Sequence, residues 1–164
     1  MKLRIKIDPE ENQCSFFSPD AVRKLESVFE KELPLLCRWS KIYAEAEVSV
    51  SFLDRTEMRY VNKQYRGLDE PTDVLAFPLW DQEENSAPPA PFIPLPLGDI
   101  VICAEEAEQE HVPMSRLEAL CLVLAHGFLH LLGWDHDTDE KEASMWERQE
   151  LLKSRLLDAM GKVS

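Results

Sequence analysis

Three of the chain's four histidines lie in one short segment, LAHGFLHLLGWDH (residues 124–136). His126 and His130 are four residues apart, so on a helix their side chains lie on the same face, one above the other. Gly133 suits the position just after a helix end, and the turn that follows can bring His136 back toward the other two. Three neutral imidazoles with one open position are typical of catalytic zinc, whereas a structural site closes with a fourth protein ligand. The spacing therefore predicts a site for one Zn²⁺ per chain, with nickel or another divalent metal as an alternative.

If the three histidines were ordinary core residues, each would need a hydrogen-bond partner, which favours the metal site.

Other titratable residues indicate a function less clearly. Asp135 has two open interpretations: it orients a ligand histidine through a hydrogen bond, or it caps the turn. His111 stands alone near Pro113 and is expected at the surface or at a helix start. Asp73 and Asp99, at strand ends, could line the cleft or hold loops, and we favour the structural role.

The histidine spacing, H-x3-H-x5-H with a glycine three residues after the second histidine, also matches the metzincin proteases. In those enzymes the residue after the first histidine is the glutamate that acts as general base. This chain has Gly127 there, and Met145 does not lie in an obvious Met-turn. A zinc peptidase therefore stays as an alternative that lacks its base.

Three ordered motifs resemble those of the YbeY family of bacterial endoribonucleases. The histidine segment resembles H-G-x-L-H-L-x-G-[YF]-D-H, residues 62–78 (NKQYRGLDEPTDVLAFP) resemble N-x-x-Y-R-G-x-D-x-P-T-D-V-L-S-F-P, and residues 97–102 (LGDIVI) resemble L-G-D-I-x-I. The match covers roughly residues 45–155. The chain departs from the family at Ala76, where serine is usual, at Trp134, where tyrosine is common, and in a long proline-rich insert at 79–96.

The resemblance implies a metal-dependent hydrolase that cuts single-stranded RNA. It further implies roles in maturation of the 16S rRNA 3′ end and in ribosome quality control, with ribosomal proteins and a ribosome-associated GTPase as partners. A second alternative is a non-catalytic ribosome assembly factor with a structural zinc. The general base stays unassigned, because activated water and the substrate's own 2′-hydroxyl are both open as the attacking group.

Basic residues around 55–66 could serve the phosphate and the RNA strand. Phosphodiester cleavage needs a positive group beside the phosphate to stabilise its negative charge. The planar guanidinium of Arg66 is the candidate for this group, in agreement with the resemblance. The alternative is that Arg66 only caps the C-terminal carbonyls of its helix. Arg59 and Lys63 share a helix face with Arg55 and are predicted to guide single-stranded RNA. Arg55 itself is expected to be a solvated surface residue.

The spacing of apolar residues and the helix-cap patterns predict the helices and strands that position these motifs. The patterns predict an α+β single domain, 1–164, in which a small mixed β-sheet of about four strands packs with several helices around a central buried helix carrying two metal ligands. The proline-rich stretch at 79–96 is predicted to be a loop insertion. Strands are expected at 2–7, 46–53, 73–77 and 98–104, and helices at 19–33, 55–65, 116–132 and 138–160.

Composition limits the kind of RNA contact, the state of the cysteines and the location of the protein. The formal net charge of −13 argues against a broad polyanion-binding surface, so any RNA contact must be local. The four cysteines are scattered without a CxxC pair, which indicates reduced thiols. The N-terminus lacks the features of a signal peptide, and the longest apolar run is too short to cross a membrane. We expect a cytoplasmic protein with no membrane partner.

Overall fold

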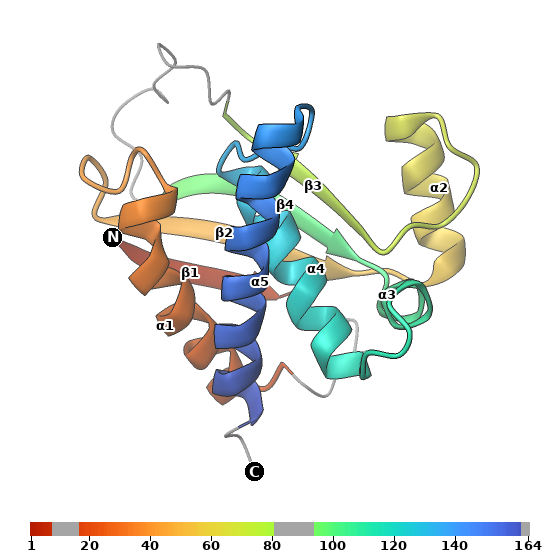
Figure 1. Cartoon of the computed structure of the whole chain (residues 1–164), viewed down its shortest axis with the longest axis horizontal. Helices are drawn as coiled ribbons and strands as arrows, with labels where there is room; N and C mark the ends of the chain where they lie inside the picture. Colours follow the sequence, from red (N-terminus) through yellow and green to blue (C-terminus); the bar gives the residue numbers. More distant parts are fainter. Residues whose placement is uncertain (8–16, 81–93, 162–164) are drawn as a thin grey trace.

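The computed structural model describes residues 1–7, 17–80 and 94–161. Its strands and helices alternate without a regular βαβ repeat (Figure 1). The elements in chain order are β1 (Lys2–Ile7), α1 (Pro19–Leu36), β2 (Glu45–Phe52), α2 (Arg55–Arg66), β3 (Val74–Pro78), β4 (Leu95–Ile102), α3 (Ala104–Glu110), α4 (Arg116–Leu131) and α5 (Asp139–Gly161).

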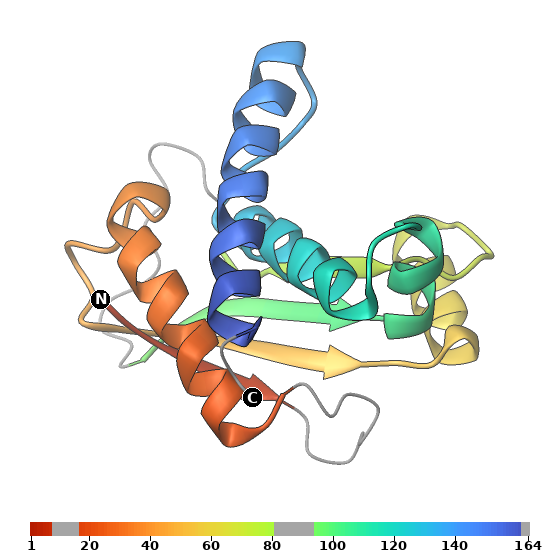
Figure 2. The ribbon, with the colours of Figure 1, turned by 60° about the horizontal axis from the view of Figure 1, so that its bottom comes forward.

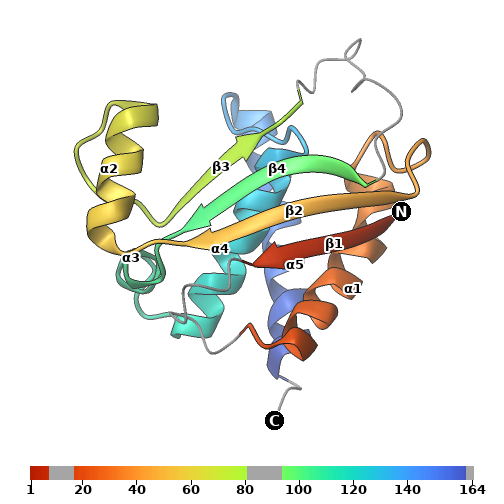
Figure 3. The same ribbon diagram turned by 180° about the vertical axis from the view of Figure 1, so that it is seen from behind.

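The sheet has four strands in the order β1-β2-β4-β3. Strands β1, β2 and β4 are parallel, and β3 runs antiparallel to β4 along one edge. Side chains of β2 alternate between buried and half-buried, as expected for a strand with one face on the core. Helices α1, α4 and α5 cover that face (Figure 2), and the view from behind shows the opposite face without them (Figure 3). The predicted mixed four-stranded α+β domain is confirmed.

The central helix is α4, which lies between the sheet and α5 (Figure 2). It begins at a Ser115 cap, whose hydroxyl accepts a hydrogen bond from the Glu118 N–H at 3.2 Å. Most of its residues are buried, as predicted. At Gly127 the helix approaches β4 so closely that a Cβ would lie 2.9 Å from Cγ2 of Ile100. Among the described residues, no helix combines the length and the apolar character needed to span a membrane.

Strand β4 differs from the prediction at its start. It begins at Leu95 and includes Pro96, two residues assigned to the loop insertion from sequence. The register between β2 and β4 shifts here, because Glu47 pairs with Pro96 but Val48 pairs with Gly98. Proline lacks an N–H and is tolerated in a sheet at such irregularities. The rest of the proposed insert, 81–93, lies outside the described residues.

Helix α3 was not expected from the sequence, which predicted a strand as far as residue 104. The strand ends at Ile102, and Ala104–Glu110 forms the helix. The intervening Cys103 is buried, and its N–H donates to the carbonyl of Asp73 at 2.9 Å. This bond ties the start of α3 to the start of β3, so the two segments lie side by side.

Candidate metal centre and its cleft

The three clustered histidines converge in the structure. Their ligand atoms all lie within 4.8 Å of one another. His126 and His130 lie on successive turns of α4, with their Nε2 atoms 3.0 Å apart, and the ring centroid of His136 is 5.4 Å from that of His130. His126 and His130 are half-buried and His136 is exposed, so the cluster is open to solvent on one side.

The turn after α4 brings His136 back. Gly133 has φ 88°, a left-handed conformation, and its N–H donates to the His130 carbonyl at 3.1 Å. The indole Nε1 of Trp134 donates to the carbonyl of Leu36 at 3.4 Å, which anchors the turn to the end of α1. The Asp135 carboxylate accepts the His136 backbone N–H at 2.7 Å, so its observed bond caps the turn.

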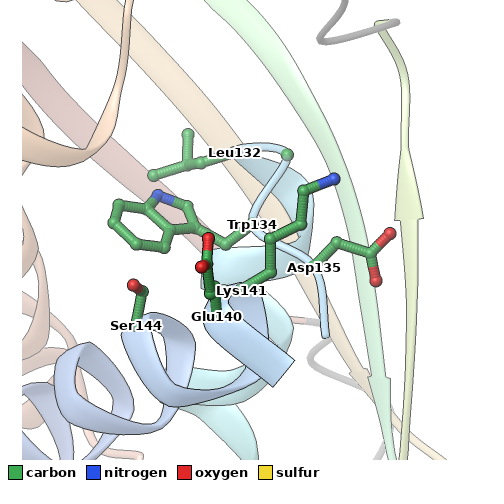
Figure 4. A pocket seen from close by; sticks show the side chains of 7 residues that line it. Leu132, Trp134, Asp135, Glu140, Lys141 and Ser144 are labelled. Carbon is green, nitrogen blue, oxygen red and sulfur yellow. The ribbon is translucent and has the colours of Figure 1, made fainter. Parts of the chain in front are cut away.

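A cavity of about 380 Å³ lies between this turn and the start of α5. Figure 4 shows that Trp134 and Asp135 point to opposite sides of it, with Lys141 and Glu140 of α5 between them. The three ligand histidines are not among its lining residues. This cavity is therefore separate from the histidine cluster, and its lining residues belong to the turn and to the first part of α5.

The histidine cluster fits a bound divalent metal ion. Burial, followed by the nearby His126 and His136, lowers the pKa of His130 to about 4, so its ring is neutral at neutral pH and offers a lone pair. Nδ1 of His126 donates to Oε1 of the buried Gln149 at 2.6 Å, which leaves Nε2 of that ring as the acceptor. Two nitrogens that bind one tetrahedral ion at 2.0–2.1 Å are about 3.3 Å apart, close to the observed separation of the Nε2 atoms. Imidazole donors suit zinc, nickel, copper or iron.

A cleft of about 520 Å³ extends from the histidine cluster. Its lining residues come from α2, α4, α5, the start of β3, the end of α3 and the turn after α4, so it forms only when the fold is complete. Arg66, the last residue of α2, lines it, and no ion pair to Arg66 occurs within the described part of the chain. The lining residues are Arg66, Asp73, Val74, His111, Leu122, Val123, His126, His136, Glu142, Met145, Trp146 and Gln149.

The other predicted RNA-contacting residues do not line this cleft. Nε of Arg59 lies 2.8 Å from Oδ1 of Asp69, and Nζ of Lys63 lies 3.7 Å from Oδ2 of the same residue. The hydrogen bond from Arg59 lowers the pKa of Asp69, which holds the carboxylate ionised. Arg55 pairs instead with Glu106 at 2.8 Å. The exposed face of α2 is thus basic but partly neutralised.

Sequence reasoning missed a second titratable cluster in the cleft. Nε2 of His111 lies 2.8 Å from Oδ2 of Asp73, and these two residues with Glu110 place ligand-type atoms within 4.8 Å of one another. Burial of its carboxyl group, and next the charge of Asp73, raise the pKa of Glu110 to about 7, although the residue as a whole is exposed. His111 and Asp73 are 38 residues apart, so no local pattern signals their contact.

Two further residues bear on function. Gly127, which occupies the position of the metzincin base, faces Ile100 of the sheet, so a carboxylate there would clash with the core. Trp146 of α5 lines the cleft, yet 62% of its surface is exposed. The one available signal for Trp146 was a large aromatic residue on a largely polar stretch of helix.

Comparison with known proteins agrees with the motifs. The family model described as Endoribonuclease YbeY matches residues 10–157. An Endoribonuclease YbeY from Thermoanaerobacter sp. (strain X514) is 38% identical over 144 residues, which cover 84% of this chain and 90% of that protein. Another from Bacillus velezensis is 37% identical over 164 residues, 98% of each chain. A solution structure of a Thermotoga maritima protein superposes with a TM-score of 0.60 at 28% identity, covering 94% of this chain and 90% of that one.

Proposed function

The chain belongs to the YbeY family of endoribonucleases, and on this premise we propose that it is a zinc-dependent enzyme that cuts single-stranded RNA. The observation that carries the metal dependence is the convergence of three imidazoles at the edge of an open cleft. The proposed biological roles are maturation of the 16S rRNA 3′ end and ribosome quality control. Ribosomal proteins and a ribosome-associated GTPase are proposed as partners on the strength of the family resemblance alone.

The proposed ligands are His126, His130 and His136. When bound there, a zinc ion would supply positive charge that polarises a phosphoryl oxygen and makes an attacking hydroxyl more acidic. Gln149 holds the His126 ring through Nδ1, which keeps Nε2 aimed at the other two rings. The largely buried α4 would hold the first two ligands, and the Gly133 turn would hold the third.

Arg66 is proposed to bind the scissile phosphate. It lies at the end of α2, lines the cleft, and keeps its five N–H donors for a ligand because no carboxylate of the described residues pairs with it. A guanidinium binds two phosphate oxygens at once and offsets the charge that grows on them during cleavage.

Selection of single strands is proposed to involve Trp146. Its exposed face lies in the same cleft as the histidine cluster, where an unpaired base can stack on it. Stacking on aromatic side chains is how many proteins bind unpaired RNA without reading its sequence. A base inside a duplex is already stacked and cannot use this surface.

Arg59 and Lys63 are proposed to guide the strand toward the cleft. Their shared partner Asp69 must release them or share them with a phosphate. Each phosphate contact that they make releases a counterion, so binding should weaken as salt rises. Changing Arg59 to Glu should weaken RNA binding and flatten its salt dependence, and an unchanged salt titration would rule this path out.

The test incubates the zinc-loaded enzyme with three separate substrates under single-turnover conditions. These are a single-stranded RNA, a duplex of the same sequence, and an unfolded protein that a peptidase would cut. We expect cleavage of the single strand only, and loss of cleavage with a chelator. Arg66→Ala should slow cleavage by about 10²–10³-fold, whereas Arg23→Ala, an exposed arginine on α1, should not change it.

Two outcomes would replace the proposal. Chelator-sensitive cleavage of the unfolded protein, with the RNA intact, would favour the zinc peptidase. A His126→Ala variant that no longer folds would favour the assembly factor with a structural zinc, because a catalytic site should lose metal and activity while keeping its fold. Full RNA cleavage by His130→Ala would exclude the histidine cluster as the active site.

A further inference from the structure

The cleft contains a histidine and a carboxylate that the proposed metal centre does not use. Asp73 precedes β3 and His111 follows α3, so the pair comes from the two segments tied together by the Cys103–Asp73 backbone bond. Both residues line the same cleft as His126, His136 and Arg66. Leu122, one helical turn before His126 on α4, also lines it, so the cleft extends along α4 beyond the histidine cluster.

Asp73 is held in a fixed orientation. Its Oδ1 accepts the Val74 N–H at 2.8 Å and lies 3.3 Å from the Thr72 hydroxyl, while Oδ2 contacts Nε2 of His111 at 2.8 Å. The side chains of Asp73 and His111 are 17% and 27% exposed. An anchored, largely buried carboxylate therefore fixes the orientation of the imidazole ring.

The contact with Asp73 decides which ring nitrogen of His111 is available. Because a carboxylate only accepts, Nε2 must carry the hydrogen and donate it. Nδ1 makes no hydrogen bond with the part of the chain that the structure describes. The ring can thus exchange a proton at Nδ1 without losing the bond that orients it.

Building on the proposed function, we infer that His111, oriented by Asp73, is the general acid that protonates the leaving 5′ oxygen when the RNA is cut. In-line displacement at phosphorus places the attacking and the leaving oxygens on opposite sides. In the proposed function, a metal held by the three histidines would polarise the phosphate and activate the attacking hydroxyl. The leaving oxygen then needs a proton donor elsewhere in the cleft, and Arg66 cannot act as one because a guanidinium does not deprotonate in proteins.

The step balances in atoms and protons. A bond forms between phosphorus and the attacking oxygen, from water or the 2′-hydroxyl, as the bond between phosphorus and the 5′ oxygen breaks. The electron pair of the broken bond stays on the 5′ oxygen, which takes the proton from Nδ1 of His111. The attacking oxygen gives its proton to solvent, and His111 regains one from solvent before the next turnover.

The charges around His111 are consistent with this role. Burial of its carboxyl group and the charge of Asp73 raise the pKa of Glu110 to about 7, so near neutral pH this carboxyl carries only part of a negative charge. Glu106 of the same helix adds to this effect. The other charged or titratable groups that line the cleft are Arg66, His126, His136 and Glu142.

The test compares two RNA substrates, one ordinary and one with sulfur in place of the scissile 5′ oxygen. A thiolate leaves without help because its pKa is far lower than that of an alcohol. The variant is His111→Gln, since a glutamine amide can still donate to Asp73 but cannot move a proton. General-acid catalysis is typically a factor of 10²–10⁴, so the variant should cut the ordinary RNA about 10²–10⁴-fold more slowly and the sulfur substrate within a few-fold of the wild-type rate.

Controls separate this inference from the function on which it rests. His111→Gln should bind as much zinc and melt at the same temperature as the wild type. Glu108→Gln, on the adjoining helix α3 but outside the cleft lining, should cut both substrates normally. An equal loss on both substrates, or no loss on either, would overturn the role of His111 and leave the nuclease proposal intact. If the zinc-loaded wild type cuts neither substrate, the proposed function fails, and the inference fails with it.

Discussion

Gln149 provides the sharpest test of how the metal centre is held together. It lies on α5, is buried, and accepts the His126 Nδ1–H at 2.6 Å. The variant Gln149→Leu keeps the side-chain size and removes the acceptor. In the metal-bound state Nε2 of His126 is committed to the ion, so the buried Nδ1–H would have no partner. In the metal-free state the ring can change tautomer or turn, so it escapes most of this cost.

The magnitude follows from this asymmetry. An unpaired buried donor costs about 1–3 kcal/mol, and a factor of ten in affinity corresponds to about 1.4 kcal/mol. Gln149→Leu should therefore weaken zinc binding by about 10–100-fold, the range seen when such outer partners are removed. Gln149→Glu, which keeps an oxygen acceptor, should bind zinc at least as tightly as the wild type.

The assay is competition for zinc against a chromophoric chelator, with circular dichroism to show that α5 stays helical. The measurement does not depend on RNA cleavage, so it addresses the site directly. Equal zinc affinity of Gln149→Leu and the wild type would refute the reasoning, because it would mean that the bond to His126 does not hold the ligand. A loss of similar size in Gln149→Glu would refute it as well.

The remaining predictions concern stability. A Cβ at Gly98 would lie 2.2 Å from the Phe77 carbonyl oxygen at φ 138°, so Gly98→Ala should lower the free energy of unfolding by at least about 3 kcal/mol. Gly67→Ala, at φ 72° in open space, should cost about 1–2 kcal/mol; equal losses in urea unfolding would contradict this ranking. Gly127→Glu should destabilise the fold without creating peptidase activity, and a stable variant that cleaves protein would show otherwise. Because the pKa of Glu110 is raised from 4.5 to about 7, its contribution to stability is present below pH 4.5 and is lost as pH rises through 7. Glu110→Gln should therefore raise the melting temperature near pH 8 but not near pH 4. An equal change in melting temperature at the two pH values would contradict this role of Glu110.

The sequence predicted best what depends on near neighbours in the chain. His126 and His130 share a helix face because of a spacing of four, and Gly133 marks the turn that returns His136. Strand alternation and helix caps likewise act over a few residues, and they placed most of the elements. The proline rule, which is also local, was wrong at Pro96 because a shift in strand register removed the need for its N–H.

What the sequence could not predict depends on distant segments. His111 and Asp73 are 38 residues apart, and His126 and Gln149 are 23 apart, so only the packed fold reveals their hydrogen bonds. A lone histidine and an aspartate before a strand each have an ordinary structural explanation. Trp146 could not be placed in the cleft until α5 was seen to pack against α4.

The three ligand histidines occupy only eleven consecutive residues, whereas Arg66, Asp73 and His111 come from separate parts of the chain. The two halves of the cleft can therefore diverge at different rates over evolution. A substitution around α2, β3 or α3 can change which RNA is accepted, or how fast it is cut, while the ion stays bound. New specificities could thus arise in this scaffold without an intermediate that has lost its metal.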